Sequence, residues 1–445
     1  MTEDLNKRLK NVAVIGAGGK MGRGISLVLL KTIIAPATFT SMKDARLILI
    51  DNSLESLSTL RVYLKTQLLK FAERNINQIR EIYREDLKLI DNSEIIDRYI
   101  EDGMSIIQTS TDVGCCQNSL MIFEAIFESL DLKTSIYRRL KNIVPKECYF
   151  FSNTSSIPIS EIDNQAELDH RIIGFHFYNP PAIQKLVEVI STAKTPKNLL
   201  SLSDVLIGSF GKIKVPSNDI AGFIGNGHFI REGLSIIKHL NDLPYQQDQG
   251  IYHLNQIVAN VMLRPMGMFQ LIDYVGLDVF SMICKTMQIY IDENFSHSLI
   301  EELINNGIKG GQFGNGSQKD GFFKYDKGKI AGVINLKKKS YTPIEELKEF
   351  DIEDELCGGT SWKELSRSRD TSVKLTEHFN NLQNNNSAAA KTAKSLLKQY
   401  IQIGQDLIKG RVTDDIVNVD SVLKNGFYHL YGPGADFIQS FQEVK

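Results

Sequence analysis

The stretch Asn11-Val-Ala-Val-Ile-Gly-Ala-Gly-Gly-Lys-Met-Gly22 decides the fold. Its first five residues form a short β-branched run, which is typical of a buried strand, and a glycine-rich segment follows without a break. Residues 24–31 then have the pattern of a helix. A strand, a glycine turn and a helix in this order predict the start of a βαβ unit, in which the turn brings backbone N–H groups close to a pyrophosphate.

The glycines of this turn are the first candidate cofactor contacts. They follow the spacing Gly16-x-Gly18-x-x-x-Gly22, or equally Gly16-x-x-Gly19-x-x-Gly22, with Met21 before the last glycine. Either spacing departs from the usual G-x-G-x-x-G pattern of a dinucleotide-binding turn. We therefore predict Gly16, Gly18, Gly19, Met21 and Gly22 as contacts of a dinucleotide, with a plain tight turn as the alternative.

Asp51 follows a second predicted strand, residues 46–50. An acidic residue at this strand end is where the 2′-hydroxyl of a ribose needs an acceptor, although Asp51 comes later in the chain than is usual. A carboxylate repels a 2′-phosphate, and Asn52-Ser53 offers no arginine to bind one. The sequence therefore favours NAD over NADP, with a helix cap as the alternative role of Asp51.

Further periodic runs extend the pattern to a whole domain. Residues 105–110, 120–126 and 148–152 predict more strands, and residues 54–84 have the periodicity of a long helical excursion from the sheet. We predict an α/β doubly wound, Rossmann-type domain followed, from about residue 215, by an all-α domain. Its predicted helices are residues 220–240, 252–263, 269–294 and 298–306.

Acid–base groups gather just beyond the last of these strands. Phe151-Ser-Asn-Thr-Ser-Ser-Ile-Pro-Ile159 contains a turn rich in hydroxyl groups, Gly174-Phe-His-Phe-Tyr178 places a histidine between aromatic residues, and Lys185-Leu-Val-Glu188 ends in a carboxylate. In open parallel sheets, ligands bind at the carboxyl ends of the strands. These residues predict a proton-transfer site, although a lone histidine between aromatic residues is more often part of a core.

Six motifs, in this order and spacing, resemble the L-3-hydroxyacyl-CoA dehydrogenase family over about residues 10–326. The resemblance implies NAD-dependent oxidation of the 3-hydroxyl group of a fatty acyl-CoA, or the reverse reduction of a 3-ketoacyl-CoA. The motifs are Ser152-Asn-Thr-Ser-Ser156, Gly174-Phe-His-Phe-Tyr-Asn-Pro180, Lys185-Leu-Val-Glu-Val189, Gly222-Phe-Ile-Gly-Asn226, Pro265-Met-Gly-Met-Phe-Gln-Leu-Ile-Asp-Tyr-Val-Gly-Leu-Asp278 and Gly321-Phe-Phe-Lys-Tyr325.

The resemblance places the catalytic residues at Ser155, His176, Glu188 and Asn226. A base that works near neutral pH must take the hydroxyl proton, and the imidazole of His176 qualifies. Glu188 is then the partner that orients the ring, and Ser155 and Asn226 hold and polarise the same substrate oxygen. The alternative roles are a helix N-cap for Ser155, a surface charge for Glu188 and a turn residue for Asn226.

The same resemblance implies further ligand contacts. Glu128, Lys133 and Asn153 are expected near the nicotinamide and its ribose, although Lys133 could equally be a solvated helix residue. Gln67 and Arg74 occupy the positions where the family contacts the phosphates of CoA. Gln67 departs from the usual small hydroxyl residue at its position.

Two departures from the family pattern keep other functions open. The glycine turn has one residue more than the family pattern, and Gly225-Asn226-Gly227 replaces a Val-Asn-Arg pattern, which adds backbone freedom beside Asn226. A dehydrogenase of a non-CoA hydroxy acid, or a weakened homologue that acts as an NAD-binding scaffold, are the alternatives.

The predicted domains are residues 1–214, the NAD-binding domain, and 215–326, the helical domain of the family. Residues 327–387 are predicted as a polar, irregular connector. Residues 388–445 resemble a second, degenerate copy of the helical domain, expected to be noncatalytic and to pack on the first copy in place of a second subunit. The expected assembly is therefore a monomer with an internal pseudo-dimer, or a homodimer.

Composition limits the partners. With 51 basic and 53 acidic residues interspersed along the chain, no nucleic acid partner is expected. No apolar run approaches the roughly 18 residues that span a membrane. The N-terminal residues lack the pattern of a targeting segment. The five cysteines, including Cys115-Cys116 and Cys357, match neither a zinc site nor a disulfide framework, so we expect no metal, a reducing compartment and a cytoplasmic location.

Overall fold

The computed structural model describes residues 2–443, apart from residues 37, 38, 43, 315, 353–355, 357 and 358, so that Cys357 lies outside the described part. The chain forms two compact units, Met1–Asp219 and Ile220–Lys445. The boundary predicted at residues 214/215 falls inside strand β8 (Ile213–Asn218), which pairs with β7 (Leu186–Ser191) in the sheet of the first unit. The first unit therefore keeps the whole of β8.

The first unit is built on an eight-stranded sheet with the order β3-β2-β1-β4-β5-β6-β7-β8. Strands β3 to β6 run parallel, β7 runs antiparallel to β6, and β8 is parallel to β7. Since β1 lies between β2 and β4, the strand order reverses at β1, which confirms the predicted doubly wound, Rossmann-type fold. The remaining strands are β1 (Asn11–Ile15), β2 (Arg46–Ile50), β3 (Ile107–Ser110), β4 (Met121–Glu124), β5 (Tyr149–Ser152) and β6 (Ile172–Phe177).

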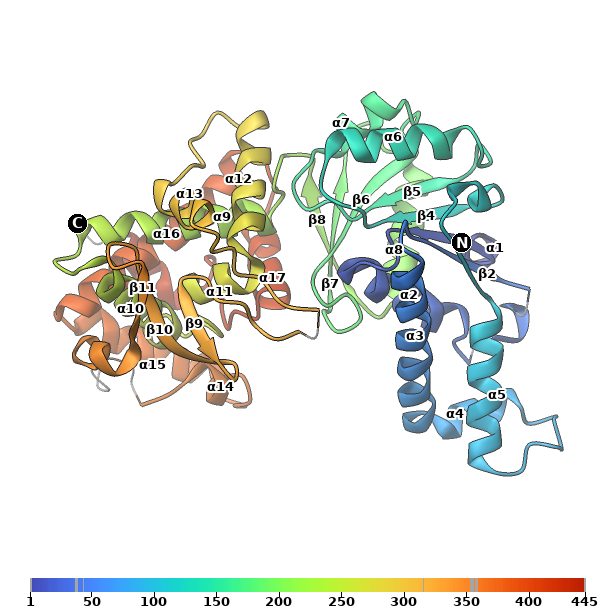
Figure 1. Cartoon of the computed structure of the whole chain (residues 1–445), viewed down its shortest axis with the longest axis horizontal. Coiled ribbons are helices and arrows are strands. Elements are labelled where there is room, and N and C mark those ends of the chain that lie inside the picture. Colours follow the sequence, from blue (N-terminus) through green and yellow to red (C-terminus); the bar gives the residue numbers. More distant parts are fainter. Residues whose placement is uncertain are drawn as a thin grey trace. The chain divides into compact units, whose positions relative to one another are not determined.

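The central strands are buried along their length, as parallel strands covered on both faces must be. Phe123, Phe151 and Phe175 pack across neighbouring strands, with ring centroids 4.7 Å and 5.4 Å apart for successive pairs. Helices cover both faces of the sheet (Figure 1). On one face lie α6 (Leu130–Lys141) and α7 (Ile159–Ala166), and on the other lie α1 (Thr2–Leu9), α2 (Lys20–Ile33) and α8 (Lys197–Ser209).

The excursion predicted as one helix over residues 54–84 is broken. Helix α3 (Leu54–Arg74) ends where the side-chain amide of Asn75 donates a hydrogen bond to the Phe71 carbonyl at 2.7 Å. Two further helices, α4 (Ile76–Ile82) and α5 (Asn92–Ser105), complete a group that extends away from the sheet (Figure 1). The hydroxyl of Ser53 caps α3 by accepting from the Ser56 N–H, so Asp51 is not the cap.

The second unit is mostly helical. The predicted helix over residues 269–294 is two helices in the structure, because Gly276 adopts a φ of +109° between them. The helices are α9 (Gly225–Lys238), α10 (Gln247–Gln256), α11 (Met268–Val275), α12 (Leu277–Tyr290), α13 (Ser298–Asn305), α14 (Trp362–Leu365), α15 (Thr371–Asn384), α16 (Ala388–Lys409) and α17 (Ile416–Gly426). Shorter 3₁₀ or π turns in this unit cover His239–Asp242, Ile257–Val261, Ile344–Phe350 and Asp436–Glu443, and 3₁₀ turns of the first unit cover Phe39–Met42 and Val113–Cys116.

The unit is not all-helical, and residues 327–387 are not an irregular connector. An antiparallel sheet of β9 (Phe323–Asp326), β10 (Lys329–Asn335) and β11 (Ser340–Pro343) leads into α14 and α15. Buried apolar side chains stabilise it, and the carboxylate of Asp273 accepts backbone N–H groups of Phe322 and Phe323 at 2.6 and 2.9 Å. The polar composition of this part of the sequence gave no sign of the sheet, because only one face of each antiparallel strand needs to be apolar.

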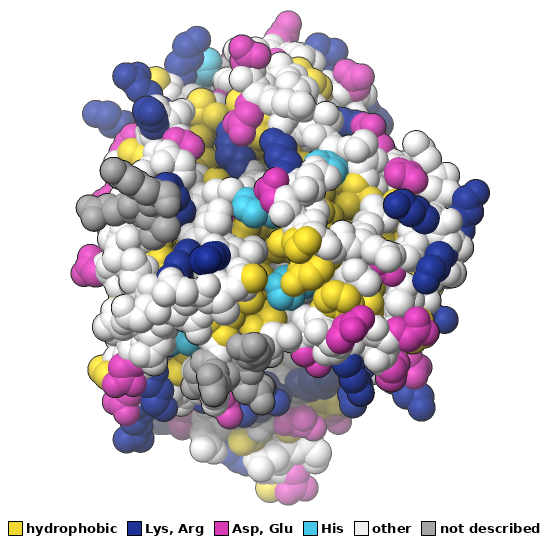
Figure 2. Space-filling view, turned by 90° about the vertical axis from the view of Figure 1, so that its left-hand side faces the viewer, with side chains coloured by type: hydrophobic (Ala, Val, Ile, Leu, Met, Phe, Trp, Pro, Cys, Tyr) yellow, Lys and Arg dark blue, Asp and Glu magenta, His cyan; other side chains and the backbone are white. Residues whose placement is uncertain are grey.

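No helix in the described part of the chain is long and apolar enough to cross a membrane. On the face of the molecule drawn in Figure 2, acidic and basic side chains are interspersed around hydrophobic and histidine side chains. The four described cysteines, at positions 115, 116, 148 and 284, are free thiols.

We predict that Gly22→Ala lowers the free energy of unfolding by about 1–3 kcal/mol, because the new Cβ would lie 2.0 Å from the Gly16 carbonyl oxygen. Chemical or thermal unfolding measures the change. Gly208→Ala near the end of α8 is the control, because its Cβ would meet no atom within 4 Å, and it should stabilise by about 0.5–1 kcal/mol. Equal stability of Gly22→Ala and wild type would contradict the close approach.

Candidate active site

The glycine turn lies at the carboxyl end of β1, where the strand order reverses. Gly16 has a φ of +78°, and a Cβ there would lie 2.6 Å from the Ala125 carbonyl oxygen. Helix α2 begins at Lys20, earlier than predicted, with Gly19 as its N-cap and no side chain capping it. The first N–H groups of α2 thus have no side-chain cap and follow a turn in which Ala17 is the largest residue, which fits a pyrophosphate.

Asp51 ties the end of β2 to this turn. Its Oδ2 accepts the Gly18 N–H at 2.9 Å, and its Oδ1 accepts the Ser53 N–H at 3.1 Å. Met21 is partly buried against the core of the first unit. The carboxylate of Asp51 thus lies beside the glycine turn, and its contact with a ribose stays a prediction.

His176 and Glu188 face each other across the antiparallel pair of β6 and β7. They are direct partners in the ladder, so their side chains project from the same face of the sheet. His176 Nδ1 lies 3.2 Å from Glu188 Oε2, and both residues are buried. The spacing of the two residues along the chain is thus explained by the hairpin-like reversal at β7, and Glu188 is not a surface charge.

Tyr178 is a third residue at the His176–Glu188 pair, and it was not identified from the sequence. Its hydroxyl donates to the same oxygen, Glu188 Oε2, at 3.0 Å. Burial, together with the neighbouring carboxylate, raises the pKa of Tyr178 well above its ordinary value, so it stays a neutral donor. The available signal was its position two residues after His176, because alternate residues of an extended chain share a face.

Glu128 organises the turn that carries Ser155. Its Oε1 accepts the hydroxyl of Thr154 at 2.7 Å and the N–H of Ser155 at 2.9 Å. It also accepts the N–H and the hydroxyl of Ser156, at 3.0 and 2.9 Å. One carboxylate oxygen therefore fixes three successive residues. Although burial opposes ionisation, Lys133 and these donors hold the pKa of Glu128 below its ordinary value.

Lys133 is buried rather than solvated. Its side chain is 1% exposed, and Nζ lies 2.7 Å from Glu124 Oε1 and 3.2 Å from Glu128 Oε2. Although burial opposes the charge, the two carboxylates hold the pKa of Lys133 above its ordinary value. Glu124 also accepts the hydroxyl of Ser152 at 2.7 Å. These contacts tie α6 to the ends of β4 and β5, so the alternative of a solvated Lys133 is wrong.

The other predicted residues are placed as follows. Asn153 Oδ1 accepts the Phe177 N–H at 2.8 Å, which links the turn after β5 to the strand of His176. Asn226 is the second residue of α9, in the second unit. On α3, Gln67 is half-buried and Arg74 exposed, about two helical turns apart.

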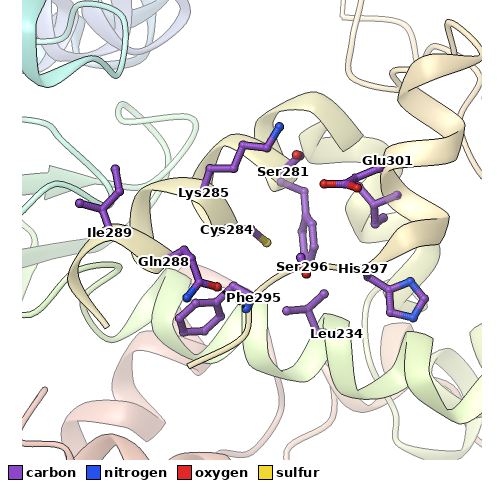
Figure 3. A pocket seen from close by; sticks show the side chains of 12 residues that line it. Leu234, Ser281, Cys284, Lys285, Gln288, Ile289, Phe295, Ser296, His297 and Glu301 are labelled. Atoms are coloured by element: carbon purple, nitrogen blue, oxygen red, sulfur yellow. Dashed lines mark hydrogen bonds between the residues drawn. The ribbon is translucent and has the colours of Figure 1, made fainter. Parts of the chain in front are cut away.

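Figure 3 shows a cavity of about 200 Å³ in the second unit, between α9, α12 and α13. Apolar and aromatic side chains, among them Leu234, Cys284 and Phe295, line it together with Lys285 and Glu301. None of the predicted site residues lines this cavity. Among the residues that the structure describes, no group of three or more His, Cys, Asp or Glu side chains is arranged to hold a metal ion.

The carboxyl ends of the central strands carry a turn that fits a pyrophosphate and, on β6, an imidazole backed by a carboxylate. Parallel strands place their carboxyl ends at one edge of the sheet, so the glycine turn and the His176–Glu188 pair share that edge. Hydride transfer needs both features, and the class of protein is a dinucleotide-dependent dehydrogenase.

Comparison with known proteins refines the class. The sequence model of the 3-hydroxyacyl-CoA dehydrogenase NAD binding domain matches residues 11–220, and that of the C-terminal domain matches residues 222–325. Human mitochondrial hydroxyacyl-coenzyme A dehydrogenase is 31% identical over 325 residues, which are 71% of this chain and 91% of the human protein. The chain belongs to the 3-hydroxyacyl-CoA dehydrogenase family, which confirms the resemblance, and it is an NAD-dependent oxidoreductase of that family.

Two other relatives extend the comparison. A glyoxysomal fatty acid beta-oxidation multifunctional protein of Brassica napus is 27% identical over 72% of this chain and 39% of its own length. The crystal structure of a 3-hydroxybutyryl-CoA dehydrogenase from Escherichia coli K12 shares the fold, with a TM-score of 0.64 and 18% identity. That match covers 97% of this chain and 93% of the E. coli chain, so the fold likeness extends beyond residue 326.

We predict that Lys133→Met destabilises the protein by about 3–5 kcal/mol, because it leaves the buried Glu124 and the largely buried Glu128 without their cation. Lys141→Met is the control on the same helix, because its pair with Glu167 is largely exposed and should change stability by no more than about 1 kcal/mol. Urea unfolding of both variants measures the difference. Similar, small losses in the two variants would contradict the structural role of Lys133.

Proposed function

We propose that this chain oxidises L-3-hydroxyacyl-CoA to 3-ketoacyl-CoA with NAD, or catalyses the reverse reduction, with His176 as the general base. The observation that carries the proposal is the buried pair of His176 and Glu188, which face each other across β6 and β7 with 3.2 Å between Nδ1 and Oε2. The match to both family domains supports the substrate class.

The pair defines which ring nitrogen reacts. Because Nδ1 faces a carboxylate, it carries the proton and donates to Glu188, and Nε2 is left to accept the proton of the 3-hydroxyl group. NAD, which the glycine turn of Gly16 to Gly22 would hold, would supply the acceptor for the hydride of carbon 3. Glu188 then stabilises the imidazolium, and Tyr178 fixes the carboxylate through its own hydrogen bond.

Ser155 and Asn226 are the proposed donors to the substrate oxygen, which matters most in the reductive direction, where negative charge develops there. Glu128 supports this role of Ser155, since it holds the backbone of the turn. We further propose Asn153 and Glu128 beside the nicotinamide ribose, with Lys133 acting through Glu128 because its ammonium group is buried.

At the other end of the ligands, the proposed contacts are Asp51 with the adenosine ribose and Gln67 and Arg74 with the phosphates of CoA. Their positions on the end of β2 and on α3 support these roles. The cytoplasm remains the proposed compartment. A monomer with an internal pseudo-dimer, or a homodimer, remains the proposed assembly.

We expect His176→Ala to lower kcat by about 10²–10⁴-fold, because the proton acceptor is lost, while NADH still binds. Loss of NADH absorbance with acetoacetyl-CoA measures turnover, and NADH fluorescence measures binding. His170→Ala is the control, because this histidine pairs with Asp163 at a partly exposed site and has no proposed role. Full turnover by His176→Ala would rule out the mechanism.

The same assay separates the alternative functions. Turnover of a keto acid without CoA, and not of acetoacetyl-CoA, would identify a non-CoA dehydrogenase. Binding of NADH with no turnover of either kind of substrate would identify a scaffold.

Two variants around the histidine should differ in size of effect. Glu188→Gln removes the charge that stabilises the imidazolium, and we expect kcat to fall by about 10²-fold or more. Tyr178→Phe removes one hydrogen bond to Glu188 and should lower kcat only several-fold, as about 1 kcal/mol implies. Steady-state kinetics at saturating NADH compare them. A larger loss in Tyr178→Phe than in Glu188→Gln would contradict the order of roles.

A further inference from the structure

Helix α9, which carries Asn226, is covered on more than one side. Phe229 packs against Phe280 of α12 with ring centroids 5.4 Å apart, and a Cβ on Gly233 would lie 3.0 Å from the same ring. A helix that is buried nearly all round needs a covering element on each side. The buried residues of α9 are Gly225, Gly227, His228, Phe229, Ile230, Glu232, Gly233, Leu234, Ile236 and Ile237.

The second covering comes from the appended segment, residues 388–443. Its helix α16 packs along α9, as Figure 1 also shows. Near the end of α9, Ser235 donates a hydrogen bond to the side chain of Gln399. Earlier in α9, the ring of Phe229 packs against that of Phe427, with ring centroids 6.0 Å apart. The appended segment therefore packs directly on α9 and is not a separate module.

The appended segment also contacts the first turn of α9, which contains Asn226. A Cβ on Gly227 would lie 3.1 Å from Cδ2 of Leu407, so the leucine side chain occupies the space beside the turn. Gly225 and Gly227 flank Asn226, and glycines give a backbone more freedom than other residues do. Neither neighbour of Asn226 has a side chain, so Leu407 supplies packing at this turn that the two glycines cannot.

The appended segment also contacts His228, the residue after Gly227. The ring of Tyr400 packs edge-on against His228, with centroids 4.9 Å apart. The guanidinium group of Arg264 lies over the rings of Tyr400 and Tyr431, at 4.2 and 4.5 Å, and donates to the Tyr400 hydroxyl at 3.3 Å. Tyr431 in turn donates to the Met262 carbonyl at 2.7 Å. Cation–π contacts of a desolvated arginine are among the stronger ones, so Tyr400 is held rigidly against α9.

We propose that the appended segment positions Asn226, with Leu407 and Tyr400 as positioning residues that fix the first turn of α9 from outside. This inference rests on the proposed role of Asn226 as a donor to the substrate oxygen. A hydrogen-bond donor that stabilises a developing charge must be held within about 0.5 Å of its productive position. A displacement of about 1 Å can lower the rate about 10²-fold.

Leu407→Ala tests the proposal in the full chain with acetoacetyl-CoA and NADH. We expect kcat to fall about tenfold or more because the turn gains freedom, while the Kd of NADH is unchanged, since the glycine turn lies in the first unit. Leu407→Met keeps the volume and should retain most of kcat. Leu375→Ala on α15 is the matched control, because it removes a buried leucine from a helix that packs on α16 and the 3₁₀ turn Asp436–Glu443, and it should leave kcat near wild type.

A double-mutant cycle with Asn226→Ala gives the decisive comparison. If Leu407 acts through Asn226, Leu407→Ala causes no further loss of kcat in the Asn226→Ala background. Equal fold-losses in both backgrounds, or wild-type kcat in Leu407→Ala, would overturn the inference. Full activity of Asn226→Ala would instead overturn the proposed function of that residue. Should Leu407→Ala fail to fold, Leu407→Val and Tyr400→Phe take its place in the cycle, with the same outcomes.

Discussion

The buried ion pairs of Lys133 with Glu124 and Glu128 are the interaction on which the first unit depends. One cation lies between two carboxylates, the buried Glu124 and the largely buried Glu128, which would otherwise have no positive charge beside them. Glu124 ends β4, next to β1 and the glycine turn, and Glu128 accepts the backbone N–H groups of Ser155 and Ser156. The strand end beside the glycine turn and the turn that carries Ser155 are therefore fixed by the same three side chains, and α6 is fixed with them.

The reversal of one strand adds the buried pair of His176 and Glu188 to this edge. If β7 ran parallel to β6, Glu188 would not stand opposite His176 in the ladder. The antiparallel step brings the two side chains to one face, and Tyr178 joins them through Glu188 Oε2. An imidazole whose Nδ1 faces a buried carboxylate keeps its second nitrogen available to accept a proton, which is what the proposed general base needs.

The second unit shows the same reliance on buried polar groups. Arg264 lies between two tyrosines, Tyr400 and Tyr431, that come from the appended segment. Nε and Nη2 of Arg264 and Oε1 of Glu232 have no hydrogen-bond partner among the described residues, so charge balance in this core rests on Glu232, His228 and the aromatic faces. Although burial opposes ionisation, His228 and Arg264 hold the pKa of Glu232 below its ordinary value. The appended segment thereby becomes part of the core around α9.

The sequence by itself determined the strand, turn and helix at Asn11–Ile15 and beyond, the Rossmann-type class and the family, because periodicity and motif order are local properties. It also identified His176 and Glu188 as candidates, though not that a strand reversal pairs them. Tertiary structure alone decided that Lys133 is buried, that Glu128 holds the turn of Ser155, and that residues 327–387 fold into a sheet and helices. Contacts between residues far apart in the chain settle these points, and no local pattern records them. The contact of Leu407 with Gly227 is a further example. The sequence shows a glycine at position 227, but only the structure shows that the side chain of Leu407 occupies the space beside it.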